Sequence, residues 1–112
     1  MMRDFTYIDD IVTGVVDILG NPPTPNEDGD CFKVYNIGNN NPVRLMDYIS
    51  TLEKHLGMTA KKEFLPMQPG DVYQTYADIT ELEKDFGFRP QTSIDYGLSM
   101  FVKWYKEYYH ID

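Results

Sequence analysis

Residues 3–12 read RDFTYIDDIV, and this stretch decides the fold class because its pattern changes partway along. Residues 3–7 alternate polar and apolar side chains, which predicts a short strand. From Ile8 to Leu19 apolar residues recur at helical spacing, and a glycine follows, so we predict an amphipathic helix over 8–19. Asp9 and Asp10 lie in its first turn, where we expect them to cap the helix and interact with its dipole.

The rest of the chain is predicted to alternate between the same two kinds of element. Strands are expected over residues 31–37 and 61–67, and a loop or short strand over 72–78. Helices are expected over 44–56, over 80–86 and over 93–109, and a Thr-x-x-Glu capping box formed by Thr80 and Glu83 should open the second of these. The predicted fold class is a small mixed α/β domain with three short strands and about four helices.

Composition excludes several classes of function. A chain of 112 residues fits one domain, and 10 basic against 18 acidic residues give a net charge of -8, which disfavours a nucleic-acid partner. No apolar run is long enough to span a membrane. The single cysteine, Cys31, cannot form an internal disulfide, so a reducing, cytoplasmic setting is expected. With only His55 and His110 as further soft ligands, no Cys/His metal site is expected either.

Two further patterns bear on function. The eight glycines form neither G-x-G-x-x-G nor a P-loop, so the chain is not expected to hold a dinucleotide cofactor by those routes. The last predicted helix carries apolar and aromatic residues at helical spacing, a stripe that is typical of a core or an interface.

Four segments, taken in order, resemble the C-terminal part of extended short-chain dehydrogenase/reductases that act on nucleotide sugars. They are RDFTYIDDIV at 3–12, YNIG at 35–38, QPGDV at 68–72 with YAD at 76–78, and GFRP at 87–90. Within that group the chain is most similar to the NAD-dependent UDP-glucuronate 4-epimerases of capsule and cell-wall sugar synthesis. The resemblance implies that residues 1–112 are the substrate-binding domain of a Rossmann-type enzyme, which oxidises C4, lets the keto sugar rotate and reduces it again.

The resemblance also implies what lies outside this sequence. In the family an N-terminal Rossmann domain holds NAD and carries a Tyr-x-x-x-Lys catalytic pair, and no tyrosine here is followed at the fourth position by a lysine. We therefore expect no catalytic residue and no bound NAD in this chain, which should be inactive alone.

Three residues receive roles from the resemblance. Arg3 matches the arginine that contacts the substrate diphosphate, and a guanidinium suits phosphate oxygens because its donors form a planar fork. Asp71 matches the carboxylate that accepts hydrogen bonds from the ribose hydroxyls. Gln68 stands where many relatives carry a second diphosphate-binding arginine, and this departure favours the glucuronate epimerases.

Two alternatives remain open at this stage. A nucleotide-sugar dehydratase or reductase of the same superfamily would share this C-terminal architecture. An interaction module is the other, in which the aromatic last helix forms a homodimer and no UDP-sugar is bound.

Overall fold

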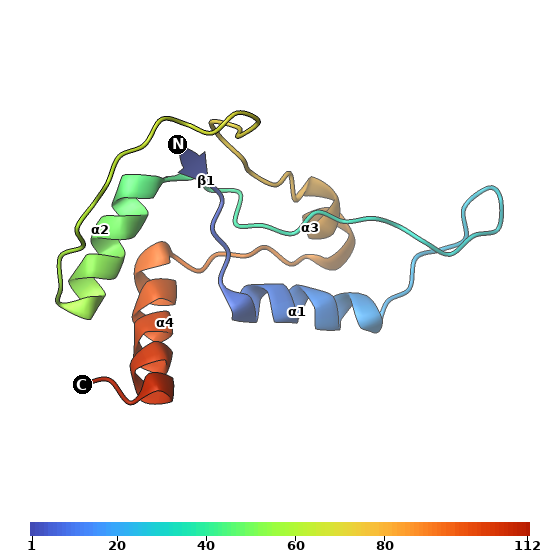
Figure 1. Ribbon diagram of the computed structural model, residues 1–112. Helices are drawn as coiled ribbons and strands as arrows, with labels where there is room; N and C mark the ends of the chain where they lie inside the picture. The colour runs from blue at the N-terminus through green and yellow to red at the C-terminus, as the bar shows by residue number, and fades with distance from the viewer.

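The computed structural model describes residues 1–112 and contains four helices and one two-stranded sheet (Figure 1). The elements, in chain order, are β1 (Met2–Arg3), α1 (Ile8–Leu19), β2 (Val43–Arg44), α2 (Leu45–Leu56), α3 (Thr80–Phe86) and α4 (Ile94–Tyr109). β1 and β2 pair antiparallel, with Met2 opposite Arg44, and a single parallel bridge joins Met2 to Gln74. No helix has both the length and the apolar character needed to cross a membrane.

The four predicted helices are confirmed, although the side-chain caps predicted for α1 and α3 are wrong. Ser93 is the N-cap of α4, and its hydroxyl accepts a hydrogen bond from the Tyr96 amide. α3 does not begin with the expected capping box, because Ile79 occupies the N-cap position. Asp78 instead accepts bonds from the Thr80 amide at 3.0 Å and the Thr80 hydroxyl at 2.6 Å, and these bonds lower the pKa of its carboxyl.

The three predicted strands are wrong in extent or absent. The first is reduced to Met2–Arg3, residues 31–37 and 61–67 form no strand, and the second sheet strand, β2, was not predicted. Extended segments become strands only when a neighbouring strand completes their hydrogen bonds. Residues 31–37 have no such neighbour, and Phe32 and Val34 are 67% and 81% exposed.

The chain is less compact than is usual for a domain of 112 residues. Only eight residues are buried, and the apolar ones among them are Ile79, Leu82, Leu98 and Val102. The radius of gyration is 17.8 Å, whereas about 13 Å is usual for a compact domain of this size. α2 and α4 lie side by side (Figure 1). The apolar stripe predicted on α4 is therefore core only in part, because Phe101, Trp104, Tyr105, Tyr108 and Tyr109 are exposed.

The carboxylate of Asp4 joins three separate parts of the chain. Its Oδ2 atom accepts hydrogen bonds from the amides of Asn40 at 3.0 Å and Ala77 at 3.1 Å, and Oδ1 accepts one from Asn41 at 3.3 Å. Next to it, Phe5 stacks on Tyr48 of α2 with ring centroids 4.0 Å apart. The first residues thereby fix the loop before β2, the segment before α3 and helix α2.

Asp10 has a comparable role, which corrects the prediction that it caps its own helix. The N-cap of α1 is Tyr7, and no side chain caps the helix. Asp10 Oδ2 instead accepts a hydrogen bond from the Thr92 amide at 3.1 Å. This bond ties α1 to the segment that leads into α4.

A polar cluster attaches α3 to residues 33–35. The Lys33 ammonium lies 2.8 Å from Glu81 and 2.5 Å from Asp85, and the Tyr35 hydroxyl donates to Asp85 at 2.7 Å. The bonds from Lys33 and Tyr35 lower the pKa of the Asp85 carboxyl. Because the folded-state pKa is lowered, the stabilisation is present at neutral pH and is lost as the pH falls below about 4.

We expect Asp4→Ala to lower the free energy of unfolding by about 2–3 kcal/mol, because three backbone amides lose a charged acceptor. Urea unfolding followed by circular dichroism measures this change. Asp28→Ala is the matched control, since the exposed Asp28 carboxylate bonds to nothing in the chain. Equal effects of the two substitutions would contradict the assigned role of Asp4.

We expect Lys33→Met to raise the pKa of the Asp85 carboxyl, because the ammonium is the first cause of its depression. Carboxyl carbon shifts followed by NMR across the acid range measure the midpoint. The same substitution should leave the titration of Asp78 unchanged, since Asp78 is governed by Thr80. An unmoved Asp85 midpoint would show that the ion pair does not form in solution.

Candidate functional site

β1 determines where Arg3 lies. The backbone of Met2 exchanges two hydrogen bonds with the segment that follows residue 72, from the Met2 amide to the Tyr73 carbonyl at 2.9 Å and from the Thr75 amide to the Met2 carbonyl at 3.3 Å. The Arg3 guanidinium donates through Nη1 to the carbonyls of Met2 at 2.9 Å and Tyr73 at 3.4 Å. Arg3 is half-buried and forms no ion pair with any carboxylate.

Gln68 and Asp71 are the two ends of one tight turn. The Asp71 amide donates to the Gln68 carbonyl at 3.2 Å, and Gly70 has a φ of +92°. Pro69 before a glycine with positive φ is the sequence typical of a type II turn, whose third position favours glycine. Both Gln68 and Asp71 are exposed, so their side chains are accessible to a ligand.

The structure brings the three predicted residues to the same region of the molecule. Arg3 bonds to the carbonyl of Tyr73, which is two residues beyond Asp71 in the chain. The connection from α2 to α3, which contains the turn, passes beside β1 (Figure 1). Arg3 and Asp71 make no ion pair with each other, so the Asp71 carboxylate and the guanidinium nitrogens other than Nη1 are not used within the chain.

Together, Arg3 and Asp71 can bind a ligand that carries both anionic and hydroxyl groups. The guanidinium has five N–H donors and uses one nitrogen on backbone carbonyls, which leaves donors for oxyanions. The Asp71 carboxylate is an acceptor only and suits hydroxyl donors. Tyr73 also contacts Arg3 through its carbonyl. It is one of nine tyrosines, and nothing in the sequence distinguishes it from the others.

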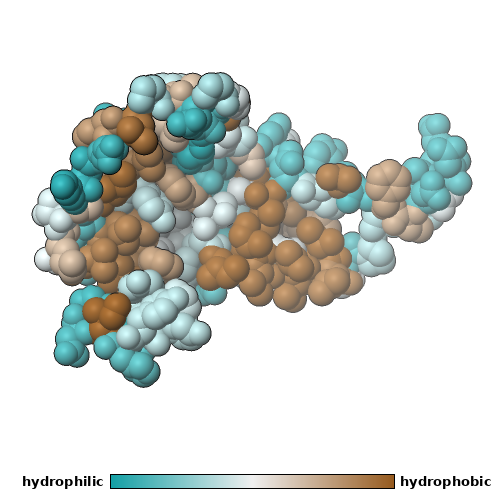
Figure 2. All heavy atoms as spheres, in the orientation of Figure 1, coloured by the Kyte–Doolittle hydropathy of each residue, from teal (hydrophilic) through white to brown (hydrophobic).

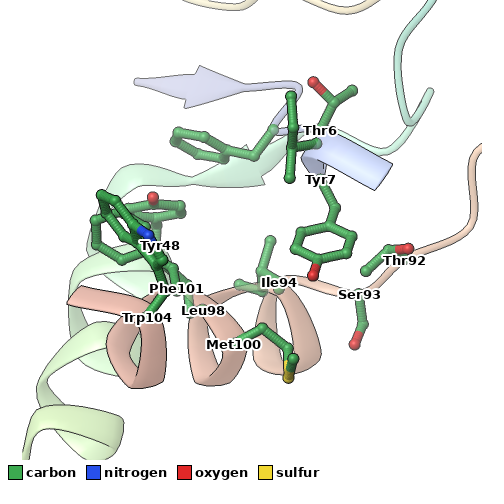
Figure 3. A pocket seen from close by; sticks show the side chains of 13 residues that line it. Thr6, Tyr7, Tyr48, Thr92, Ser93, Ile94, Leu98, Met100, Phe101 and Trp104 are labelled. Atoms are coloured by element: carbon green, nitrogen blue, oxygen red, sulfur yellow. The ribbon is translucent and has the colours of Figure 1, made fainter. Parts of the chain in front are cut away.

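A second feature, an apolar cavity of about 570 Å³, lies between residues 5–8, α2 and α4 (Figure 3). Its walls include Phe5, Tyr48, Leu98, Phe101 and Trp104. None of the three predicted site residues lines it. Such a lining suits apolar side chains rather than a diphosphate, and sequence analysis did not identify it because its walls come from three separate segments.

The residues present do not form a dinucleotide site of Rossmann type. Dinucleotide sites of Rossmann type need parallel strands that lead through a glycine-rich turn into a helix. The sheet here has two antiparallel strands of two residues each, and α1 begins after Tyr7 without a glycine. No group of three or more His, Cys, Asp or Glu side chains is placed to hold a metal ion.

Comparison with known proteins gives the relationship of the chain. Protein CapI of Staphylococcus aureus is 45% identical over 120 residues, and a probable UDP-glucuronate 4-epimerase of Rhizobium meliloti is 40% identical over 121 residues. Each match covers 97% of this chain. The chain is homologous to the C-terminal part of the UDP-sugar epimerases. The family resemblance seen in the sequence motifs is thereby confirmed.

A solved structure agrees with the sequence relatives. The UDP-glucuronic acid 4-epimerase of Bacillus cereus, in complex with UDP-glucuronic acid and NAD, superimposes with a TM-score of 0.76 at 36% identity. The match covers 95% of this chain and 32% of that one. No family model matches the chain.

The chain spans about a third of the length of these relatives, 36% of both curated proteins. The similarity therefore concerns only the part of each relative that this chain matches.

Proposed function

We propose that this chain is the nucleotide-sugar-binding part of an NAD-dependent UDP-sugar epimerase of the UDP-glucuronate 4-epimerase type. The observation that carries the proposal is the position of Arg3, which bonds to the carbonyl of Tyr73 two residues beyond the Gln68–Asp71 turn, in a chain 40% identical to a probable UDP-glucuronate 4-epimerase. In this function the chain binds and orients the substrate, which is catalysis by positioning.

Arg3 binds the diphosphate in this proposal. The backbone bonds of Met2 hold the β1 backbone, and the carbonyls of Met2 and Tyr73 orient the guanidinium. A guanidinium oriented in advance loses less conformational freedom on binding than a free one.

Asp71 and Gln68 bind the rest of the nucleotide. The carboxylate of Asp71 accepts bonds from the ribose hydroxyls, and the type II turn fixes its backbone. The Gln68 amide donates a neutral hydrogen bond where an arginine would add charge, so Arg3 carries most of the phosphate neutralisation from this chain. NAD and the acid/base chemistry belong to the part of the enzyme that this chain does not contain.

We expect the chain to bind UDP with a dissociation constant near the millimolar range, about 4 kcal/mol, because only part of the site is present. Arg3→Gln should weaken UDP binding about tenfold and leave uridine binding unchanged, since uridine has no phosphate. Asp71→Asn should weaken the binding of UDP and of uridine to the same degree, since both carry the ribose hydroxyls. NMR titration of the amide resonances measures each constant.

The matched control for Arg3→Gln is Arg44→Gln, which makes the same change of charge at an arginine already paired with Asp47. NAD serves as a ligand control. If UDP does not bind at millimolar concentration to a folded chain, or binds equally to all variants, the proposed function is wrong and an interaction module becomes the better account.

The exposed face of α1 bears on the partner. Ile8, Val12, Val15, Val16 and Leu19 are between 49% and 78% exposed. Figure 2 shows a continuous hydrophobic area over this helix. The opposite side of α1 is used within the chain, since Gly14 is buried against Ile37 and Phe88. We propose that this exposed face packs against a segment equivalent to the N-terminal two-thirds of the relatives, the part that this chain does not match.

We expect this chain to bind the N-terminal two-thirds of the CapI relative when the two are produced separately and mixed. The double variant Val12→Asp, Val16→Asp should abolish complex formation, because it places two charges in an apolar contact. Thr13→Asp, exposed on the same helix, is the matched control and should bind as before. Analytical ultracentrifugation measures the complex, and unchanged binding by the double variant would exclude this face.

A further inference from the structure

A second cavity, of about 530 Å³ and widely open to solvent, is polar where the first is apolar. Three consecutive asparagines, residues 39–41, line one side, and Arg89, Pro90, Gln91 and Ser93 line the other, with no hydrophobic residue among them. None of these residues belongs to the proposed nucleotide site. The cavity therefore requires a separate explanation.

The carboxylates of Asp4 and Asp10 hold in place the two segments that line this cavity. Asp4 accepts bonds from the amides of Asn40 and Asn41, and Asp10 accepts one from Thr92. The Asn39 side-chain nitrogen donates to the Thr92 carbonyl at 3.3 Å, which links the two walls directly. Pro90 is among the most deeply buried side chains of the chain. The walls are thus fixed before any ligand arrives.

Asn39 has an unused acceptor at this site. The residue is only 8% exposed, its nitrogen bonds to Thr92, and its amide oxygen receives no hydrogen bond from the chain. Every fully buried side-chain nitrogen or oxygen in the chain has a hydrogen-bond partner. The Asn39 oxygen has none, so it is accessible to solvent, and Asn39 is one of the residues that line the cavity. A polar atom placed in this way is available to a ligand hydroxyl.

Arg89 supplies an unused positive charge. Of the three arginines, Arg44 pairs with Asp47 and Arg3 bonds to two carbonyls, whereas Arg89 has neither a salt bridge nor a hydrogen bond within the chain. The side chains of Asn40, Asn41 and Gln91 likewise make no hydrogen bond within the chain, and each offers both donors and an acceptor.

We propose that this cavity binds a small sugar that carries a single anionic group. Arg89 binds the carboxylate or phosphate, and the amides around it bind ring hydroxyls, which like an amide are both donors and acceptors. A single charge fits best, because the chain has a net charge of -8 and two carboxylates, Asp4 and Asp10, lie behind the walls. The volume is within the range of small-ligand sites.

The test is an NMR titration of this chain with glucuronate, glucose 6-phosphate and glucose. We expect saturable shifts of the amides at 39–41, 89 and 91–93 with at least one anionic sugar, and the two anions distinguish a carboxylate from a phosphate ligand. Arg89→Gln should weaken that binding about tenfold, and neutral glucose should bind at least about tenfold more weakly. Arg44→Gln and Arg3→Gln should leave it unchanged.

Gln91→Ala provides a second variant, since this side chain is exposed and makes no hydrogen bond within the chain. It should weaken binding while leaving the spectrum otherwise intact. The proposal is overturned if neither anionic sugar saturates at millimolar concentration, if Arg89→Gln binds as tightly as the parent chain, or if glucose binds equally well. Because Arg3→Gln is expected to affect only UDP, this result and that of the nucleotide titration are independent.

Discussion

The carboxylate of Asp4 is the constraint on which most of this structure depends. It accepts hydrogen bonds from residues 36, 37 and 73 positions further along the chain, and so does part of the work that a longer sheet does in other domains. The contact also explains the glycine at position 38. A Cβ atom there would lie 2.8 Å from Asp4 Oδ2 and 2.6 Å from the Ala77 side chain, so only glycine allows the approach. One short side chain thus adds to the few backbone bonds that join β1 to β2 and to residue 74, and helps to set the spacing between these three segments.

Both of the sites that we propose depend on this constraint. Arg3 and Asp4 are adjacent, and while Asp4 fixes the backbone against the loops at 40–41 and 77, Arg3 extends to the carbonyl of Tyr73. The same bonds to Asn40 and Asn41 form one wall of the polar cavity. In the motif RDFTY the aspartate therefore has an architectural role, whereas ligand binding is what we propose for the arginine beside it.

The helices were predictable from sequence because their signals are local. Apolar spacing, glycines such as Gly57 and Gly87 in the left-handed conformation, and the Ser93 cap all act within one or two turns. The strands were not, because extended segments need partners that lie far away in the chain or outside it. The capping role predicted for Asp10 was wrong for a related reason: Asp10 lies in the first turn as expected, but its hydrogen-bond partner, Thr92, is 82 residues away. The site residues came from the family resemblance, and the polar cavity joins two loops that no local pattern connects.

The balance of forces in this chain differs from that of a small domain with a full core. With four apolar residues buried and five apolar residues of α1 exposed, burial contributes less than usual, and charged hydrogen bonds at Asp4, Asp10 and Asp85 hold the segments together. Such bonds are specific in direction, so they define positions well even where they add little free energy. They also leave the apolar face of α1 uncovered, and covering it would bring the burial that the chain lacks without altering the contacts that already exist. The polar bonds set the geometry of the chain, whereas the apolar face of α1 adds little to its stability while that face stays exposed.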